Sequence, residues 1–275
     1  MKHTLFAFAA TLLLLGTLPT PADAQNDQPT VLITGSSKSH GLVFVNDYAE
    51  RGWKVIATCR TPSQADELQA LAAKYPDVVV EELDVTDFAE VDALAAKYRG
   101  QPIDVLNLNG AINTFRVGLN KFGETDYAWL EQVLKVNIIG QLYVAEAFLE
   151  HVASSKQKKI AVMSAEGASI NRVQSSLAPS YRASKAGLNM LMRTYGEAVK
   201  DRGVIVAIIA PGTIDYRDYM NAEDPSVIPE AYRRRLARGS MAPRSAIPAM
   251  IELIDGLTLD DINKFHLWNG EVLPW

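Results

Sequence analysis

The chain has 275 residues, of which 48% are hydrophobic and 21% charged, and its formal net charge at pH 7 is -5. This length fits one large α/β domain, and this composition supports a sizeable core and excludes general disorder. The negative charge argues against nucleic acid as a partner, because the chain has no overall basic field. The local run RRRLAR, Arg233 to Arg238, is typical of a solvated helix face, with an anion site as the alternative.

The first residues predict a signal peptide. MKH is a basic start, Leu5 to Leu18 is apolar, and Ala22-Asp23-Ala24 is a small-residue cleavage site. The apolar stretch is shorter than the ~20 residues that a membrane span needs. We therefore expect cleavage after Ala24, a periplasmic or secreted mature domain of residues 25–275, and no stable membrane span after cleavage. A wrongly assigned start is the alternative.

Strands and helices alternate along the rest of the chain. The predicted strands are TVLITG, WKVIATCR, DVVVEELDV, IDVLNLNG, KKIAVMSA, VIVAIIAPG and KFHLWNG. The predicted helices cover residues 41–52, 63–74, 88–98, 125–154, 180–203 and 246–257. Apolar strands that alternate with helices indicate a Rossmann-type, doubly wound parallel sheet of about seven strands in a single domain. Cys59, the only cysteine, lies in the second strand, where we expect it to be inert core.

Ligands of such a sheet bind outside the carboxyl ends of its strands. The segments predicted there are Thr34–Gly41, Cys59-Arg60, Asp84-Val85, Asn109–Ala111, Ser164–Gly167 and Pro211-Gly212. These segments are therefore the first candidates for a functional site.

The segment TGSSKSHG, Thr34 to Gly41, has the position and composition of a loop that holds a dinucleotide pyrophosphate, and we call it the phosphate loop. The cofactor contacts expected from it are Gly35, Ser37, Lys38, Ser39, His40 and Gly41. Ser39 stands where such loops have a middle glycine, so we expect weak but real cofactor binding. His40 adds a cation at low pH if it lies in the site; a surface histidine without a role is the alternative.

The end of the second strand favours NADP(H). An NAD site offers an acid to the ribose hydroxyls about 20 residues after the loop, whereas this strand ends TCR. Arg60, with Lys38, is suited to pair with a 2′-phosphate, although two solvated cations are the alternative. NAD(H) is not excluded.

The segment YRASK places Tyr181 and Lys185 on one face near the start of a helix. A phenol has an ordinary pKa near 10, which makes it a poor acid or base at neutral pH. An ammonium within reach stabilises the phenolate, so we expect Lys185 to lower the pKa of Tyr181. The pair predicts acid–base catalysis, and Lys185 is also suited to hold ribose hydroxyls.

The mature chain resembles the short-chain dehydrogenase/reductase family, and most of all its C-factor-like and sniffer-type carbonyl reductase branch. The motifs that carry the resemblance are GLVFVNDYAERGWKVIATCR, LDVTD, VNIIG, YRASKAGLNML and WNGEVLPW. It implies NADP(H) as cofactor and a small carbonyl or alcohol as substrate, and it leaves a homodimer open. No metal is implied.

The resemblance also implies roles for single residues. Asn137 of VNIIG would hold a water that links Lys185 to solvent, and Asp84, next to Val85, would contact the adenine. Asn109 would line the cofactor, and Pro211-Gly212 would flank the nicotinamide.

Three positions depart from the family pattern besides Ser39. The family's Asn-Ala-Gly reads Asn109-Gly110-Ala111, and Tyr216 stands where a threonine is expected. Ser164 of SAEG is the expected carbonyl-polarising serine, although an ungapped match places Ala165 there. The chain is thus predicted to be an NADP-dependent carbonyl reductase, and the alternative is an exported, non-catalytic binding or signalling protein with weak cofactor binding.

Overall fold

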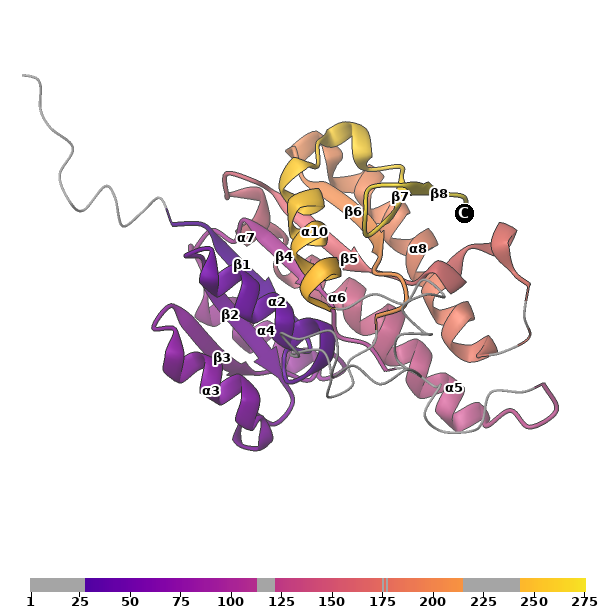
Figure 1. The fold of residues 1–275 in the computed structure, drawn as a ribbon, viewed down its shortest axis with the longest axis horizontal. Helices are drawn as coiled ribbons and strands as arrows, with labels where there is room; N and C mark the ends of the chain where they lie inside the picture. The colour runs from indigo at the N-terminus through magenta and orange to yellow at the C-terminus, as the bar shows by residue number, and fades with distance from the viewer. Residues whose placement is uncertain (1–27, 113–121, 175, 177, 215–242) are drawn as a thin grey trace, which may run out of the picture.

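The computed structural model describes residues 28–112, 122–174, 176, 178–214 and 243–275. Within them the strands form one sheet of order β3-β2-β1-β4-β5-β6-β7-β8 (Figure 1). The strands are β1 (Thr30–Ile33), β2 (Lys54–Cys59), β3 (Val78–Glu82), β4 (Val105–Leu108), β5 (Lys159–Met163), β6 (Ile205–Ala210), β7 (Phe265–Leu267) and β8 (Val272–Leu273). All pairs are parallel except β7 with β8, which confirms the predicted Rossmann-type architecture.

The sheet contains one strand that the sequence did not predict. β8 is a two-residue strand that returns antiparallel to β7 after Gly270, whose φ of +86° favours glycine. Two residues are too few to show any periodicity, which is why the pattern gave no sign of it.

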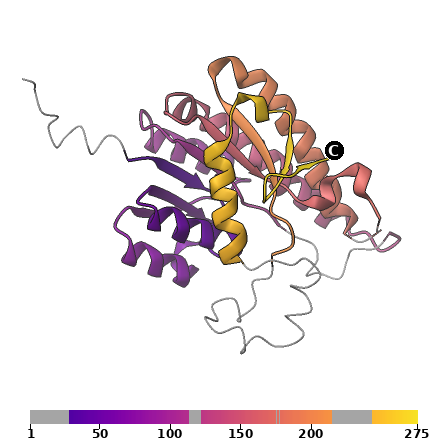
Figure 2. The same ribbon diagram turned by 45° about the horizontal axis from the view of Figure 1, so that its top comes forward.

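Helices cover both faces of the sheet (Figures 1 and 2). The α-helices are α2 (Ser39–Glu50), α3 (Asp66–Lys74), α4 (Phe88–Lys97), α5 (Tyr127–Leu134), α6 (Gln141–Ala147), α7 (Leu149–Ala153), α8 (Pro179–Val199) and α10 (Pro243–Gly256). The single helix predicted over residues 125–154 is wrong in detail, because the π-helical turn η3 (Lys135–Gly140) separates α5 from α6. At Gly140 an added Cβ would lie 2.7 Å from the Val85 carbonyl oxygen, so this turn approaches the end of β3 closely.

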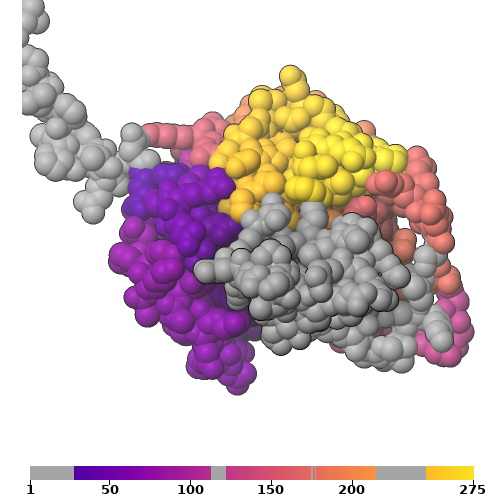
Figure 3. Space-filling view, viewed as in Figure 1, coloured from indigo at the N-terminus to yellow at the C-terminus, as the bar shows by residue number. Residues whose placement is uncertain are grey.

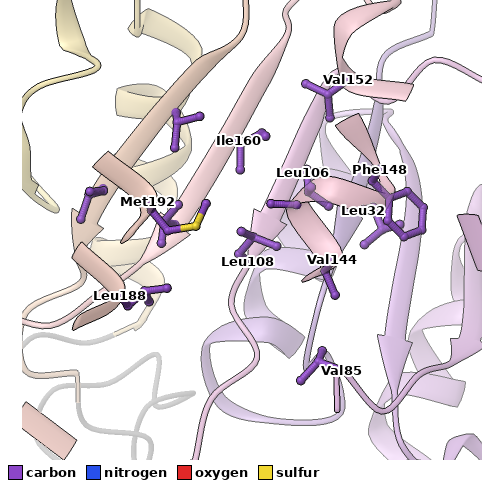
Figure 4. Close-up of a cluster of buried hydrophobic side chains, with 14 of the residues drawn as sticks. Leu32, Val85, Leu106, Leu108, Val144, Phe148, Val152, Ile160, Leu188 and Met192 are labelled. Carbon is purple, nitrogen blue, oxygen red and sulfur yellow. The ribbon is translucent and has the colours of Figure 1, made fainter. Parts of the chain in front are cut away.

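Successive residues of each central strand belong to two hydrophobic clusters, one on each face of the sheet. Leu32 of β1, Leu106 of β4 and Ile160 of β5 pack with Val144 and Leu188 on the face covered by α4, α6 and α8 (Figure 4). Their sequence neighbours point to the other face, and the residues there include Val31, Val105, Ala161, Phe44 of α2 and Ile251 of α10. Two buried faces explain why the strands read as continuous apolar runs.

Cys59 is 4% exposed in this second cluster, which confirms its prediction as core. No helix among the described residues is long and apolar enough to cross a membrane.

Candidate active site

The two glycines of the phosphate loop are required by close packing. Gly35 has φ +69°, and an added Cβ there would lie 2.8 Å from the Gly110 Cα. A Cβ on Gly41 would lie 2.2 Å from the Gly35 carbonyl oxygen. The loop after β1 therefore turns tightly against the segment after β4, and any side chain at either glycine would push the two apart.

Ser39 follows the backbone course of a glycine. Its φ is +54°, in the left-handed region, and it is the first residue of α2. That conformation costs a non-glycine residue about 1–2 kcal/mol. The main-chain N–H groups of the first turn have no intrahelical partner, so the helix terminus still offers donors and a positive dipole end to a phosphate. The loop fits a pyrophosphate at the cost of a strained serine.

Asn109 and Gly110 are bound to the phosphate loop. The Asn109 Nδ2 donates to the carbonyl oxygens of Thr34 (2.9 Å) and Gly35 (3.2 Å). The Gly110 N–H donates to Thr34 Oγ1 at 2.8 Å. An added Cβ on Gly110 would lie 3.2 Å from that hydroxyl oxygen. Glycine therefore suits the middle position of Asn-Gly-Ala, the order that replaces the family's Asn-Ala-Gly in this chain. The Asn109 side chain thus fixes the loop rather than standing free beside it.

His40 is not a surface histidine. It is half-buried in the first turn of α2, and its Nε2 is shielded from solvent. Burial, followed by the charge of Lys185, lowers the pKa of His40 to about 4. We therefore expect His40 to be a cation only below a pH of about 4. The sequence offered a cation at low pH or a surface histidine; the lowered pKa limits the first alternative, and the burial of Nε2 argues against the second.

Lys38 and Arg60 are exposed at the same end of two neighbouring strands. Lys38 precedes α2, and Arg60 follows β2, whose Thr58 carbonyl oxygen accepts the Ser36 N–H at 2.8 Å. Parallel pairing of β1 with β2 brings both carboxyl ends to one edge. Two exposed cations thus lie at this edge, which is compatible with the predicted pairing to a 2′-phosphate, and Ser37 is half-buried.

Asp84 and Val85 lie at the carboxyl end of the next strand. One Asp84 carboxylate oxygen accepts from both Thr86 N–H (2.8 Å) and Thr86 Oγ1 (2.7 Å). Val85 is 9% exposed and faces Gly140 of η3. Asp84 therefore stabilises its own turn, and the residue lies at the edge where the resemblance expects the adenine.

Helix α8 brings Tyr181 and Lys185 to the carboxyl end of β5. Lys185 is 2% exposed, and its Nζ donates to the Met163 carbonyl oxygen at 2.7 Å. Tyr181 lies one turn earlier and is half-buried, and its carbonyl oxygen accepts the Ser184 hydroxyl at 2.7 Å. Two residues far apart in sequence from the phosphate loop therefore reach the same edge of the sheet.

In this structure burial, rather than the charge of Lys185, shifts the pKa of Tyr181, and the expected lowering by Lys185 stays a prediction. Burial raises the pKa of Tyr181 to about 12, and burial lowers the pKa of Lys185 to about 7. Both shifts come from loss of solvent around the charged form. In this environment Tyr181 is a protonated phenol at neutral pH, and Lys185 titrates near neutrality.

Ser164 donates its hydroxyl within the protein. Its Oγ donates to Asn189 Oδ1 at 2.5 Å, and the serine is 3% exposed. A hydroxyl has one proton to donate, so this bond leaves none for a substrate carbonyl. The Ser164 hydroxyl is thus used inside the protein in this structure. The neighbouring Ala165 is half-buried directly before η4, and the choice between the two registers stays a prediction. Asn189 was not predicted from the sequence, although it follows Lys185 by one turn on the same helix face.

Asn137 holds the segment that follows β4. In η3 its Oδ1 accepts the Ile112 N–H at 2.9 Å, while its Nδ2 donates to the Ile112 carbonyl oxygen and to Ser184 Oγ, both at 3.0 Å. Both Nδ2 protons and one lone pair of Oδ1 are thus used by protein partners. Ser184, the second residue overlooked in the sequence, links Asn137 to the carbonyl of Tyr181.

Pro211 and Gly212 directly follow β6 at the same edge. Pro211 is buried and Gly212 has φ +73°. Tyr216 and the run from Arg233 to Arg238 lie outside the described residues.

The sequence matches the family described as short chain dehydrogenase over residues 29–225, so the chain belongs to the short-chain dehydrogenase/reductase family. The NADPH-bound carbonyl reductase from chicken fatty liver is 28% identical, with a TM-score of 0.77 over 90% of this chain and 99% of that one. The carbonyl reductase Sniffer of Drosophila melanogaster, 22% identical with a TM-score of 0.74 over 90% and 100%, shares the fold. The C-signal protein of Myxococcus xanthus is 26% identical over 63% of this chain and 93% of its own.

The resemblance drawn from the sequence is therefore confirmed. The protein is a short-chain oxidoreductase that uses NAD(P)H on carbonyl or alcohol substrates. The phosphate loop, Arg60 and the Tyr181–Lys185 pair lie at the carboxyl ends of the strands, the edge at which ligands of such sheets bind.

Proposed function

We propose that the protein is an NADPH-dependent carbonyl reductase. The observation that carries the proposal is the Lys185 Nζ bond to the Met163 carbonyl oxygen, which fixes the Tyr181 face of α8 at the ligand end of β5. The NADPH-bound carbonyl reductase with the same fold supports it.

The phosphate loop, Lys38 and Arg60 would hold the cofactor. Gly35 and Gly41 let the loop turn tightly into the N-terminus of α2, whose main-chain N–H groups suit a pyrophosphate, and the two exposed cations suit a 2′-phosphate. NADPH supplies the hydride that reduces a carbonyl carbon.

Tyr181 would donate the proton to the carbonyl oxygen. Burial keeps the Tyr181 phenol protonated at neutral pH, as a proton donor must be. The raised pKa also makes the phenol a weaker acid, so the transfer would depend on a positive charge beside the phenolate. Lys185, which titrates at about 7, would supply a positive charge below that pH and favour the phenolate that remains after the transfer. The Ser164–Asn189 bond supports Ala165 at the family's serine position, which leaves Tyr181 as the principal donor to the oxygen.

The test is oxidation of NADPH and of NADH by purified protein with an aromatic aldehyde. We expect NADPH to be preferred, and the double variant Lys38→Ala/Arg60→Ala to lose most of that preference, about 10- to 100-fold. Lys54→Ala, an exposed cation at the opposite end of β2, is the matched control and should leave the preference unchanged. A wild type that prefers NADH would refute the cofactor assignment.

We propose separately that the chain is exported and cleaved after Ala24, on the strength of the basic, apolar and Ala-Asp-Ala segments. Intact mass of protein recovered outside the cytoplasm tests this. Full-length chain found in the cytosol alone would contradict it.

A further inference from the structure

Trp275, two residues beyond β8, joins three elements of the fold. Its ring stacks on Phe265 of β7, with centroids 5.6 Å apart and planes 20° from parallel. The Arg193 guanidinium of α8 lies 4.7 Å from the centre of the same ring. Phe265 is fully buried, so the Trp275 ring packs against the hydrophobic core.

The main chain of Trp275 holds the loop that follows β5. This loop, residues 166–173, contains the short helical turns η4 (Glu166–Ala168) and η5 (Ile170–Arg172). The Trp275 carbonyl oxygen accepts the Asn171 N–H at 3.0 Å and the Ser169 hydroxyl at 3.4 Å. Figure 3 shows the surface of the last residues meeting that of the segment after β5. The ring thus anchors Trp275, and Trp275 anchors the loop.

The other side of the loop reaches the candidate active site. The loop begins directly after Ala165 and leads toward α8, the helix of Tyr181. An added Cβ on Gly167 would lie 3.4 Å from the Arg182 side chain, so η4 packs on the residue next to Tyr181. A shift of the loop would therefore disturb the packing directly beside Tyr181, the proposed proton donor.

The loop also presents apolar surface at this end of the sheet. The side chains of Ile170 and Val173 are 74% and 56% exposed, on either side of the anchored Asn171. Exposed apolar side chains beside a reaction site are suited to contact the apolar body of a substrate.

We propose that Trp275 is a positioning residue of the reductase, which holds the loop 166–173 in place for a carbonyl substrate with an apolar body. This inference rests on the proposed function. Trp275 contacts Phe265 and Arg193 through its ring and the loop through its main chain, so it acts on the site through the loop.

The experiment compares Trp275→Ala with Trp275→Phe, using NADPH and 4-nitrobenzaldehyde. Trp275→Ala should raise KM for the aldehyde about tenfold and leave kcat and the KM for NADPH within about twofold. Trp275→Phe retains a ring to stack on Phe265 and should behave nearly like the wild type. Trp53→Phe is the control, since Trp53 packs on Tyr48 at the start of β2 and should lower stability without a change in the aldehyde KM.

Hydrogen–deuterium exchange separates this inference from the proposed function. The peptide that contains Asn171 should exchange at least about tenfold faster in Trp275→Ala than in the wild type, because its N–H loses an ordered partner. An unchanged exchange rate, or an aldehyde KM that stays at the wild-type value, overturns the positioning role. Faster exchange in a protein whose wild type has no turnover would instead refute the reductase and, with it, the substrate role of the loop.

Discussion

The phosphate loop and the catalytic face of α8 relate to the family pattern in opposite ways. The loop lacks the middle glycine, yet Ser39 adopts a left-handed φ of +54° and the backbone keeps its course. Helix α8 has the expected tyrosine and lysine, yet the serine that should assist them is bonded to Asn189. A site made of main-chain groups tolerates a changed side chain at the cost of strain, whereas a site made of side chains depends on where each polar group finds its partner.

The largest effect is expected from a substitution on the catalytic face of α8 that leaves the phosphate loop unchanged. Tyr181→Phe removes the proton donor and should lower kcat by about 10²- to 10⁴-fold, the range for general acid catalysis. Cofactor binding should stay nearly intact, because the phosphate loop is unchanged. Steady-state kinetics and NADPH titration measure the two quantities; retained turnover would exclude Tyr181 as the acid.

The second prediction concerns the burial of Lys185. Its pKa falls from an ordinary value of 10.5 to about 7 in the folded protein, so between these values the unfolded chain binds more protons. Stability therefore rises with pH across this window, by up to ~1.4 kcal/mol per pH unit from this group. Lys185→Met should remove that slope in urea unfolding measured from pH 7 to 10, whereas Lys54→Met, at an exposed position, should leave it. An identical slope in both variants would contradict the burial.

The third prediction sharpens the comparison at the loop. Ser39→Gly relieves a left-handed serine and removes a Cβ from the loop that is expected to hold the pyrophosphate, so NADPH should bind about tenfold more tightly, or ~1.4 kcal/mol. Unfolding stability should rise by about 1 kcal/mol or less, because glycine also gains freedom in the unfolded chain.

A matched control separates strain from phosphate contact. Lys158 has the same φ of +54° just before β5, at the opposite end of the sheet. Lys158→Gly should stabilise the fold to a similar degree and leave NADPH affinity unchanged by calorimetry. Weaker NADPH binding after Ser39→Gly would instead identify the serine as a phosphate ligand.

The smallest effect is expected at Ser164. Since its hydroxyl donates to Asn189, Ser164→Ala should lower kcat less than about tenfold and act mainly on stability, leaving a buried amide oxygen without its donor. Asn189→Ala should give a similar thermal loss. A fall in kcat comparable to that of Tyr181→Phe would restore Ser164 as the polarising group.

The sequence by itself determined the order of seven strands, the two-sided core and the edge at which the site lies. Apolar runs between helices allow little else than a covered parallel sheet, and Tyr181 and Lys185 share a helix face by spacing alone. Gly35, Lys38, Gly41 and Arg60 were also predictable, because they lie at or after the carboxyl ends of the first two predicted strands.

The hydrogen-bond partners and neighbours of the site residues were decided only by the tertiary structure. That Ser164 faces Asn189, that Asn137 is used by Ile112 and Ser184, and that His40 is shielded beside Lys185 depends on contacts between segments far apart in the chain. The same holds for β8 and for Trp275, whose role arises from β7, α8 and the loop after β5 together. Local patterns determine which face a residue takes, whereas burial and hydrogen bonding, which set its pKa and its role, are properties of the packed whole.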